Sequence, residues 1–259
     1  MLTHLANAAI RVAPALVAAI ALAGCIAGPV ETVSTPASAG GAIAVPQGAR
    51  AFDVDPAATR VTALVYRAGP LARLGHNHAI TSGGETGVIW LGAAPESSGF
   101  EIHLPVAAFI VDDPVAREAA GPEFPGVVPD DARAGTTTNM LRAEVLDGAR
   151  YPEIVVRSIS AIGTWQQAVV HAAIRLKDVE REFDVPVALS VTGDAVQATG
   201  ALQVRQTDFG ITPFSVAGGA IQVADVVNLK FEITAVARGS PANKNHVENA
   251  AHRSNIALQ

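Results

Sequence analysis

The feature that most constrains the fold of this chain is the recurrence of apolar residues at every second position. In residues 226–236, VVNLKFEITAV, each alternate side chain from Val227 to Ala235 is apolar, and those between them are polar. The same alternation runs through residues 100–106, 168–177 and 184–191. Successive side chains of a β-strand point to opposite faces, so this period predicts strands that bury one face.

About eight such strands, antiparallel and closely spaced, are expected between residues 48 and 237. Eight is the number at which a closed antiparallel barrel becomes wide enough to hold one small ligand. A β-sandwich is the competing architecture, and the alternation alone does not separate the two. Alanine and valine supply much of the apolar content, so we expect an interior cavity. Its predicted lining is Phe100, Ile102, Leu104, Ile174, Leu176, Val187, Leu189, Phe209, Leu229 and Phe231.

Two stretches break the alternation. Residues 136–148 offer threonines as an N-cap, an apolar stripe from Met140 to Leu146, and Gly148 as a stop signal, which together predict one short helix. The preceding residues, 112–135, are rich in proline, glycine and acidic side chains. We expect a long loop there, of the kind that often covers a binding site.

Both ends of the chain are expected to lie outside this domain. Residues 1–25 contain an apolar run after Arg11 that suits a signal peptide. They end in LAGC, which resembles a bacterial lipobox and predicts lipidation of Cys25; an ordinary cleaved signal with an incidental cysteine is the alternative. The residue after the cysteine is Ile26, not aspartate, which favours a periplasmic domain anchored to the outer membrane. Residues 26–47 are expected to form a flexible tether, and residues 238–259 a disordered tail.

Charge excludes one class of partner. The formal net charge is −6, and the sequence contains no basic run. Nucleic-acid binding depends on clustered lysine and arginine, so it is set aside. The oligomeric state is not indicated by the sequence.

His76 and His78 stand two positions apart in the segment LARLGHNHAI, residues 71–80. On a strand they would share one face and act together, as ligand-contacting groups or as metal ligands; in a loop, that reasoning from the strand period fails. A metal needs three or four ligands, and a third would have to come from elsewhere in the chain. The candidates for it are His103, His171, Asp208 and Glu85. No serine or cysteine lies in a recognisable nucleophile motif, so the sequence does not indicate an enzyme.

Five segments in order resemble the YceI-like family of bacterial periplasmic proteins. They are AFDVDPAATRVTALVYRAG (51–69), RYPEIVVRS (150–158), IRLKDVEREFDVPVALSV (174–191), ALQVRQTDFGI (201–211) and VADVVNLKFEITA (223–235). The chain departs from the family pattern at Asp178, where glycine is usual, and at the histidine pair.

This resemblance implies a lipocalin-like antiparallel barrel that binds and does not catalyse. The implied ligand is a long-chain isoprenoid, a quinone or a similar amphiphilic lipid, held in the barrel interior for transport, storage or sensing. No resident cofactor is implied. The alternative function is that of a metal- or haem-binding envelope protein that uses His76 and His78.

Overall fold

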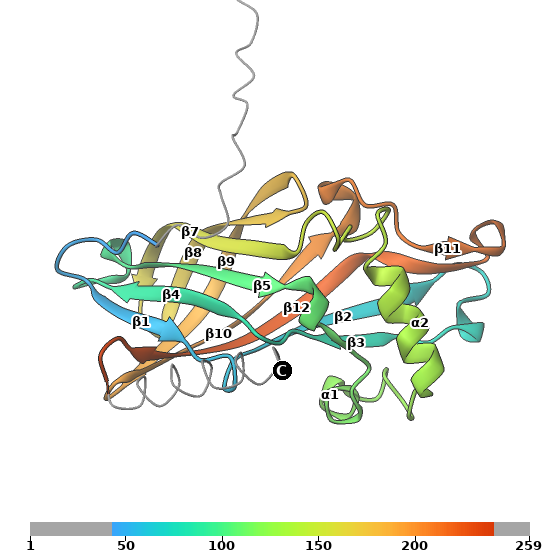
Figure 1. Ribbon diagram of the computed structural model, residues 1–259, viewed down its shortest axis with the longest axis horizontal. Helices are drawn as coiled ribbons and strands as arrows, with labels where there is room; N and C mark the ends of the chain where they lie inside the picture. Colours follow the sequence, from blue (N-terminus) through green and yellow to red (C-terminus); the bar gives the residue numbers. More distant parts are fainter. Residues whose placement is uncertain (1–42, 241–259) are drawn as a thin grey trace, which may run out of the picture. The chain divides into compact units, whose positions relative to one another are not determined.

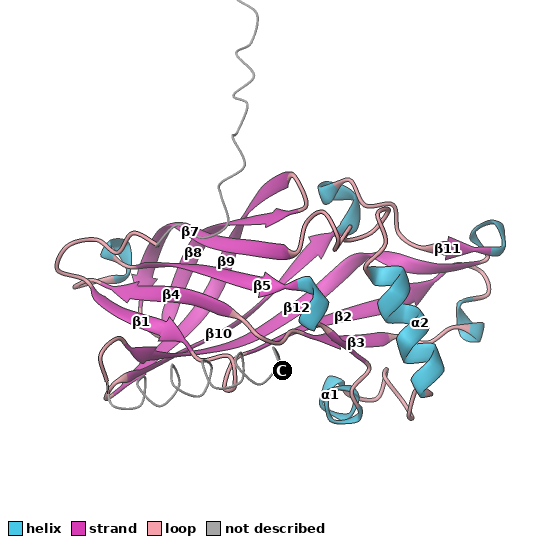
Figure 2. Cartoon of the chain, viewed as in Figure 1, coloured by secondary structure: helices cyan, strands magenta, loops and turns pink. Residues whose placement is uncertain are grey.

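Twelve β-strands and two α-helices make up the part of the chain that the computed structural model describes, residues 43–240 (Figures 1 and 2). The predictions for residues 1–42 and 241–259, which include the signal peptide and Cys25, lie outside this range. The strands are β1 (Arg50–Val54), β2 (Arg60–Ala68), β3 (His78–Thr81), β4 (Thr86–Leu91), β5 (Gly99–Pro105), β6 (Ile110–Val111), β7 (Glu153–Thr164), β8 (Gln167–Leu176), β9 (Val179–Thr192), β10 (Ala195–Arg205), β11 (Ser215–Val216) and β12 (Ile221–Ala237). The helices are α1 (Pro114–Ala120) and α2 (Asp130–Met140), and five short 3₁₀ turns are η1 (Ala72–Leu74), η2 (Pro95–Ser97), η3 (Val106–Ala108), η4 (Gln206–Phe209) and η5 (Ala217–Gly219).

The sheet closes on itself through the first and last strands of the ring. Eight strands pair in the order β1-β4-β5-β7-β8-β9-β10-β12, and β12 pairs back to β1 with Phe52 opposite Ala237. Every neighbouring pair in this ring is antiparallel. Closure removes the free sheet edges that a sandwich would keep. The expected eight-stranded antiparallel barrel is therefore confirmed.

The long strand β12 pairs with two different strands, β1 and β2, along the same edge. Its last residues pair with β1, whereas residues 222–232 pair with β2, which continues through β3 to the short β6. A register irregularity between Val223 and Val227 interrupts the β12–β2 pairing. As a result, β2 and β3 extend the barrel wall beyond the end of β1.

Small residues allow large ones to lie across the interior. Gly200 of β10 is paired with Phe231 of β12. A Cβ atom added at Gly200 would lie 2.4 Å from the Phe231 ring and 2.5 Å from the carbonyl oxygen of Pro186. Because Gly200 has no side chain, the Phe231 ring can pack directly against the backbone of β10.

The expectation of one short helix at residues 136–148 is wrong. The helix α2 begins earlier, at Asp130, and ends at Met140, while residues 141–148 form turns. The hydroxyl groups of Thr136, Thr137 and Thr138 donate to carbonyl oxygens four residues back, so these threonines lie inside the helix and do not cap it. Two acidic residues in the first turn favour the earlier start, because they complement the positive end of the helix dipole.

The expected long loop at residues 112–135 also contains regular structure. The side chain of Asp113 accepts hydrogen bonds from the amides of Val115 and Ala116, and Pro114 occupies the first turn of α1. This arrangement is a favourable helix start. Residues 121–129 connect α1 to α2. Neither helix within residues 43–240 has the length and apolar character needed to cross a membrane.

Candidate ligand-binding site

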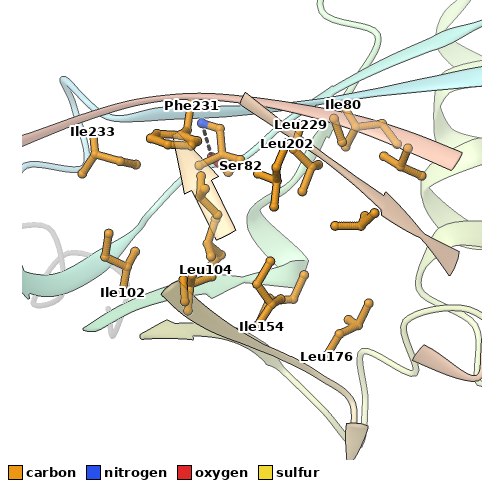
Figure 3. A pocket seen from close by; sticks show the side chains of 18 of the residues that line it. Ile80, Ser82, Ile102, Leu104, Ile154, Leu176, Leu202, Leu229, Phe231 and Ile233 are labelled. Atoms are coloured by element: carbon orange, nitrogen blue, oxygen red, sulfur yellow. Dashed lines mark hydrogen bonds between the residues drawn. The ribbon is translucent and has the colours of Figure 1, made fainter. Parts of the chain in front are cut away.

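The barrel encloses a cavity of about 440 Å³ that is lined almost entirely by apolar side chains. This volume lies within the range of small-molecule sites in proteins. Figure 3 shows Leu229 and Ile154 on opposite sides of the cavity. All ten side chains predicted to face the interior line it: Phe100, Ile102, Leu104, Ile174, Leu176, Val187, Leu189, Phe209, Leu229 and Phe231.

Cross-strand rows define the long direction of this cavity. Ala198 pairs with Ile233 in the β10–β12 ladder, and Val204 pairs with Val227 six residues farther along β10. At about 3.3–3.4 Å per residue, this part of the cavity wall is roughly 20 Å long. All four of these side chains line the cavity. The wall is therefore long enough to accommodate an extended apolar chain.

One end of this wall is polar. The row of Val204 and Val227 continues through Val65 of β2 to His78 of β3. Arg205 and Gln206 follow Val204 directly, and both line the cavity, as do Thr136 and Asn139 of α2. The next row inward, which ends at Ile80, is wholly apolar. The rest of the lining is apolar apart from Ser82, Ser98, Ser158 and Trp165, so polar side chains are most numerous beside the Val204–His78 row.

His78 lies in a cluster with His76 and Asp112. Their potential ligand atoms all lie within 4.8 Å of one another, and the two imidazole rings meet edge to face with centroids 4.5 Å apart. His76 precedes β3, so the two histidines do not share a strand face as predicted, yet their rings are in contact. Among residues 43–240 this is the one group of three or more such side chains arranged closely enough to hold a metal ion.

Asp112 is fully buried and its carboxylate is held by three donors. Oδ2 lies 2.7 Å from Nδ1 of His78, and Oδ1 accepts from the amide of Ala79 at 2.9 Å and from Nη1 of Arg117 at 2.6 Å. Burial by itself raises the pKa of Asp112, but the hydrogen bonds from His78, Ala79 and Arg117 outweigh it and hold the pKa below its usual value. The carboxylate is consequently ionised at neutral pH.

Arg117 holds this cluster in place through hydrogen bonds to Asp112 and to three backbone carbonyl groups. It is 2% exposed and donates to the carbonyl oxygens of Asn77, Pro125 and Gly126 as well as to Asp112. The intervening Asn77 is also buried; its side chain accepts from the amide of Arg67 and donates to the carbonyl oxygen of Glu123. The GHNH segment is thus tied to β2 on one side and to the α1–α2 region on the other.

The environment of His76 favours its neutral form. Burial is the main cause that lowers its pKa below 6.5, and the neighbouring His78 lowers it further. Neutral imidazole is the form that binds metal ions or accepts a hydrogen bond. At neutral pH, His76 therefore presents an uncharged ring beside His78.

None of the four residues predicted as a third partner joins this cluster. His103 contacts Glu101 of its own strand and Glu153 of the neighbouring β7, and His171 contacts Glu182 and Asp184 of the neighbouring β9. Glu85 is buried and hydrogen-bonded to Ser82, and Asp208 lies in η4. Asp112 takes that place because β6 pairs with β3 and brings residue 112 beside His78. The sequence Asp112-Asp113-Pro114 at the start of α1 could have indicated this partner of the histidines, but it was not predicted from the sequence.

A closed eight-stranded antiparallel barrel is wide enough inside to hold one small ligand, and this one contains an apolar cavity. A sequence profile described as YceI-like domain matches residues 52–235, and the chain belongs to this family. No curated protein sequence matches the chain significantly.

The fold is also that of a solved structure. BcnA of Burkholderia cenocepacia superposes with a TM-score of 0.53 at 16% identity, over 71% of this chain and 99% of that one. A YceI protein of Campylobacter jejuni is similar over 62% of this chain and 85% of that one, with 9% identity and a TM-score of 0.46. At 16% identity the likeness to BcnA supports the fold alone.

Proposed function

We propose that this protein binds one long-chain amphiphile, such as an isoprenoid or a quinone-type lipid, with the chain inside the barrel. The observation that carries this proposal is the apolar cavity of about 440 Å³, in which His78 and Arg205 stand together among the lining side chains. The chain would lie along the wall between Ile233 and Val227, and the head group would lie near His78 and Arg205. The protein would serve as a carrier, a store or a sensor of that lipid.

The size of the cavity favours long chains over short ones. At ~30 Å³ per water-sized group, the cavity holds roughly fifteen such groups. Burying fifteen methylenes at about 0.8 kcal/mol each yields a gross gain of about 12 kcal/mol. Association itself costs about 4–15 kcal/mol, so short chains bind weakly. Affinity is therefore expected to increase steeply with chain length until the cavity is full.

Titration with farnesol, an isoprenoid alcohol, tests this proposal. Trp165 lines the cavity, so its fluorescence reports occupancy. The substitution Ala172→Phe adds a ring inside the cavity, whereas Ala188→Phe adds one on the exposed face of the adjacent strand β9. We expect saturable binding to the wild type and to Ala188→Phe, and at least a tenfold loss in Ala172→Phe. Equal binding to both variants would place the probe outside the barrel and contradict the proposal.

The anchor is a further part of this proposal. We infer from the LAGC segment that the protein is an exported lipoprotein, attached to the outer membrane through lipidated Cys25. Membrane fractionation of the wild type and of Cys25→Ser tests the inference. We expect the wild type in the membrane fraction and the variant in the soluble periplasmic fraction; a variant that remains membrane-bound would contradict it.

Metal binding is the second candidate function, and the cluster of His76, His78 and Asp112 is the observation that favours it. Asp112 already accepts from Arg117 and Ala79, so the two histidines would be the principal ligands and Asp112 would orient His78. Imidazole ligands suit Zn²⁺ and Cu²⁺. Calorimetric titration with each ion is expected to show one site that is lost in His76→Ala and kept in His103→Ala. Identical isotherms for both variants would exclude this cluster as the site.

A further inference from the structure

We propose that one end of the barrel, next to β11, docks on a lipid bilayer that contains anionic lipids. The docking surface, which we name the apolar lip, consists of residues 69–75 from the β2–β3 connection and residues 212–220, which include β11 and η5. This inference rests on the proposed function, because the bilayer is the source of the amphiphile that the cavity would bind. It assigns the place on the molecule at which protein and bilayer meet.

Two segments that are far apart in the sequence lie side by side in the apolar lip. The amide of Leu71 donates to the carbonyl oxygen of Ala220 at 2.8 Å, and a Cβ atom added at Gly69 would lie 2.8 Å from the same oxygen. Strand β11 pairs with the start of β12, with Val216 opposite Ile221. Figure 1 shows β11 and the β2–β3 connection at the same end of the barrel. The apolar lip is therefore one surface, joined by backbone hydrogen bonds.

Large apolar side chains are exposed on the apolar lip. They are Leu71 (36% exposed), Leu74 (64%), Phe214 (38%) and Val216 (41%). Phe214 also lines the cavity, whereas the other three do not. The apolar lip is therefore an outer surface that is continuous with the cavity. Clustered exposed apolar side chains of this kind indicate an interaction site.

The charge of the apolar lip favours an anionic partner. Arg67, which donates to the carbonyl oxygen of Gly75, and Arg73 of η1 are both exposed. Neither arginine forms an ion pair with another residue that the structure describes. Residues 56–84 and 209–224 contain no acidic side chain, although the whole chain has a net charge of −6. Unmatched arginines beside exposed apolar side chains are the combination that binds an anionic bilayer interface.

The exposed apolar side chains of the α1–α2 region lack this positive charge. Val115 and Val127 are 74% and 77% exposed. Residues 113–131 around them contain five acidic side chains and a single basic one, Arg117, which is buried and paired with Asp112. An anionic bilayer repels a region of this charge. The α1–α2 region is therefore not the surface that docks.

The opposite end of the barrel is also less suited to an anionic bilayer. Ile162 and Val169, which are 62% and 37% exposed, pair there across the β7–β8 ladder. Arg50 at that end is already paired with Asp194. A guanidinium that is matched by a carboxylate offers little net charge to a lipid phosphate. Of these three surfaces, the apolar lip alone combines unmatched arginines, exposed apolar side chains and continuity with the cavity.

A tryptophan placed on the apolar lip tests the contact with the bilayer. Full-length wild type, Leu74→Trp and Ile162→Trp are each mixed with excess vesicles of phosphatidylethanolamine and phosphatidylglycerol whose acyl chains carry bromine, which quenches tryptophan on contact. The wild type gives the contribution of Trp90 and Trp165, which is subtracted. The two substituted side chains are 64% and 62% exposed, so Ile162→Trp is the matched control. We expect the added tryptophan to lose emission in Leu74→Trp and to keep it in Ile162→Trp.

The contribution of charge is measured in the Leu74→Trp protein. Adding Arg73→Gln removes a cation of the apolar lip, whereas adding Arg60→Gln removes one at the start of β2, roughly 25 Å of strand away. That separation exceeds the Debye length of about 8–10 Å. On the anionic vesicles, Arg73→Gln should decrease the ratio of docked to undocked protein about fivefold, and Arg60→Gln should leave it unchanged. On brominated phosphatidylcholine vesicles, which have no net charge, neither substitution should change the quenching.

The outcomes separate docking from lipid binding in the cavity. If the added tryptophan of Leu74→Trp keeps its emission, or if Ile162→Trp is quenched equally, docking through the apolar lip is refuted even where farnesol binds. Emission of Leu74→Trp that shifts to shorter wavelength as the protein concentration is raised without vesicles would assign the apolar lip to a second copy of the chain, and would also overturn the inference. Quenching confined to Leu74→Trp in a protein that does not bind farnesol would support docking and refute the proposed function.

Discussion

The substitution Arg117→Met removes the cation that faces the buried Asp112 carboxylate. Methionine keeps the aliphatic stem, so the main change is the loss of the guanidinium. That group donates to Asp112 at 2.6 Å and to three backbone carbonyl oxygens, and it is only 2% exposed. The variant therefore leaves a buried negative charge unmatched and several buried acceptors without a partner.

Removing one partner of a buried ion pair costs about 3–5 kcal/mol of folding free energy. For a domain of this size, 1 kcal/mol corresponds to about 2–4 °C in Tm, so the expected decrease is about 6–20 °C. The control is Arg157→Met. Arg157 pairs with Glu180 at 2.7 Å, but both side chains are about 40% exposed, and such a pair contributes about 0–1 kcal/mol.

Urea unfolding followed by tryptophan fluorescence measures both variants, because Trp90 and Trp165 lie in the described barrel. The double variant Asp112→Asn with Arg117→Met should lose less than the sum of the two single losses, since it leaves no unmatched charge. A loss below about 1 kcal/mol for Arg117→Met, equal to that of Arg157→Met, would show that the Arg117–Asp112 ion pair does not hold the site together.

The remaining predictions concern packing and titration. Gly200→Ala is expected to cost about 1–3 kcal/mol in urea unfolding, because its Cβ would meet a ring and a backbone carbonyl; an unchanged midpoint would contradict this. The hydrogen bond that His171 donates to Asp184 raises the pKa of His171, whereas burial lowers the pKa of His76. In NMR titrations His171 should therefore titrate at the higher pH, and the reverse order would be inconsistent. The pKa of Asp112 is lower in the folded protein than in the unfolded chain, so its carboxylate stabilises the fold above the unfolded pKa, and this stability is lost as the pH falls through the folded pKa. In Asp112→Asn, the free energy of unfolding should therefore decrease less steeply as the pH is lowered into the acid range. An unchanged slope would count against this.

The barrel could be predicted from sequence because its determinant is local. Alternation along β5, β8, β9 and β12 assigns each side chain to a face without knowledge of its partners, and all ten predicted lining residues face the cavity. Ring closure is different, because it depends on the pairing of Phe52 with Ala237 across nearly the whole domain. The family resemblance supplied that part of the prediction.

The site was predicted only in part because its contacts are not local. His78 was recognised, but its partner Asp112 lies 34 residues away and reaches it through the β3–β6 pairing. Arg117 was missed as well, because the helix that carries it was interpreted as a loop. The predicted helix at residues 136–148 was misplaced because threonine serves both as an N-cap and as an interior residue that bonds to the preceding turn.

Mass spectrometry of an organic extract is the most direct test of lipid binding inside the barrel. The full chain is purified from bacterial membranes, with Ala172→Phe and Ala188→Phe prepared in parallel. We expect a long-chain amphiphile in near-stoichiometric amount with the wild type and with Ala188→Phe, and its loss from Ala172→Phe. Wild-type protein that is free of lipid, or equal lipid in all three preparations, would contradict the claim that the barrel cavity is the binding site.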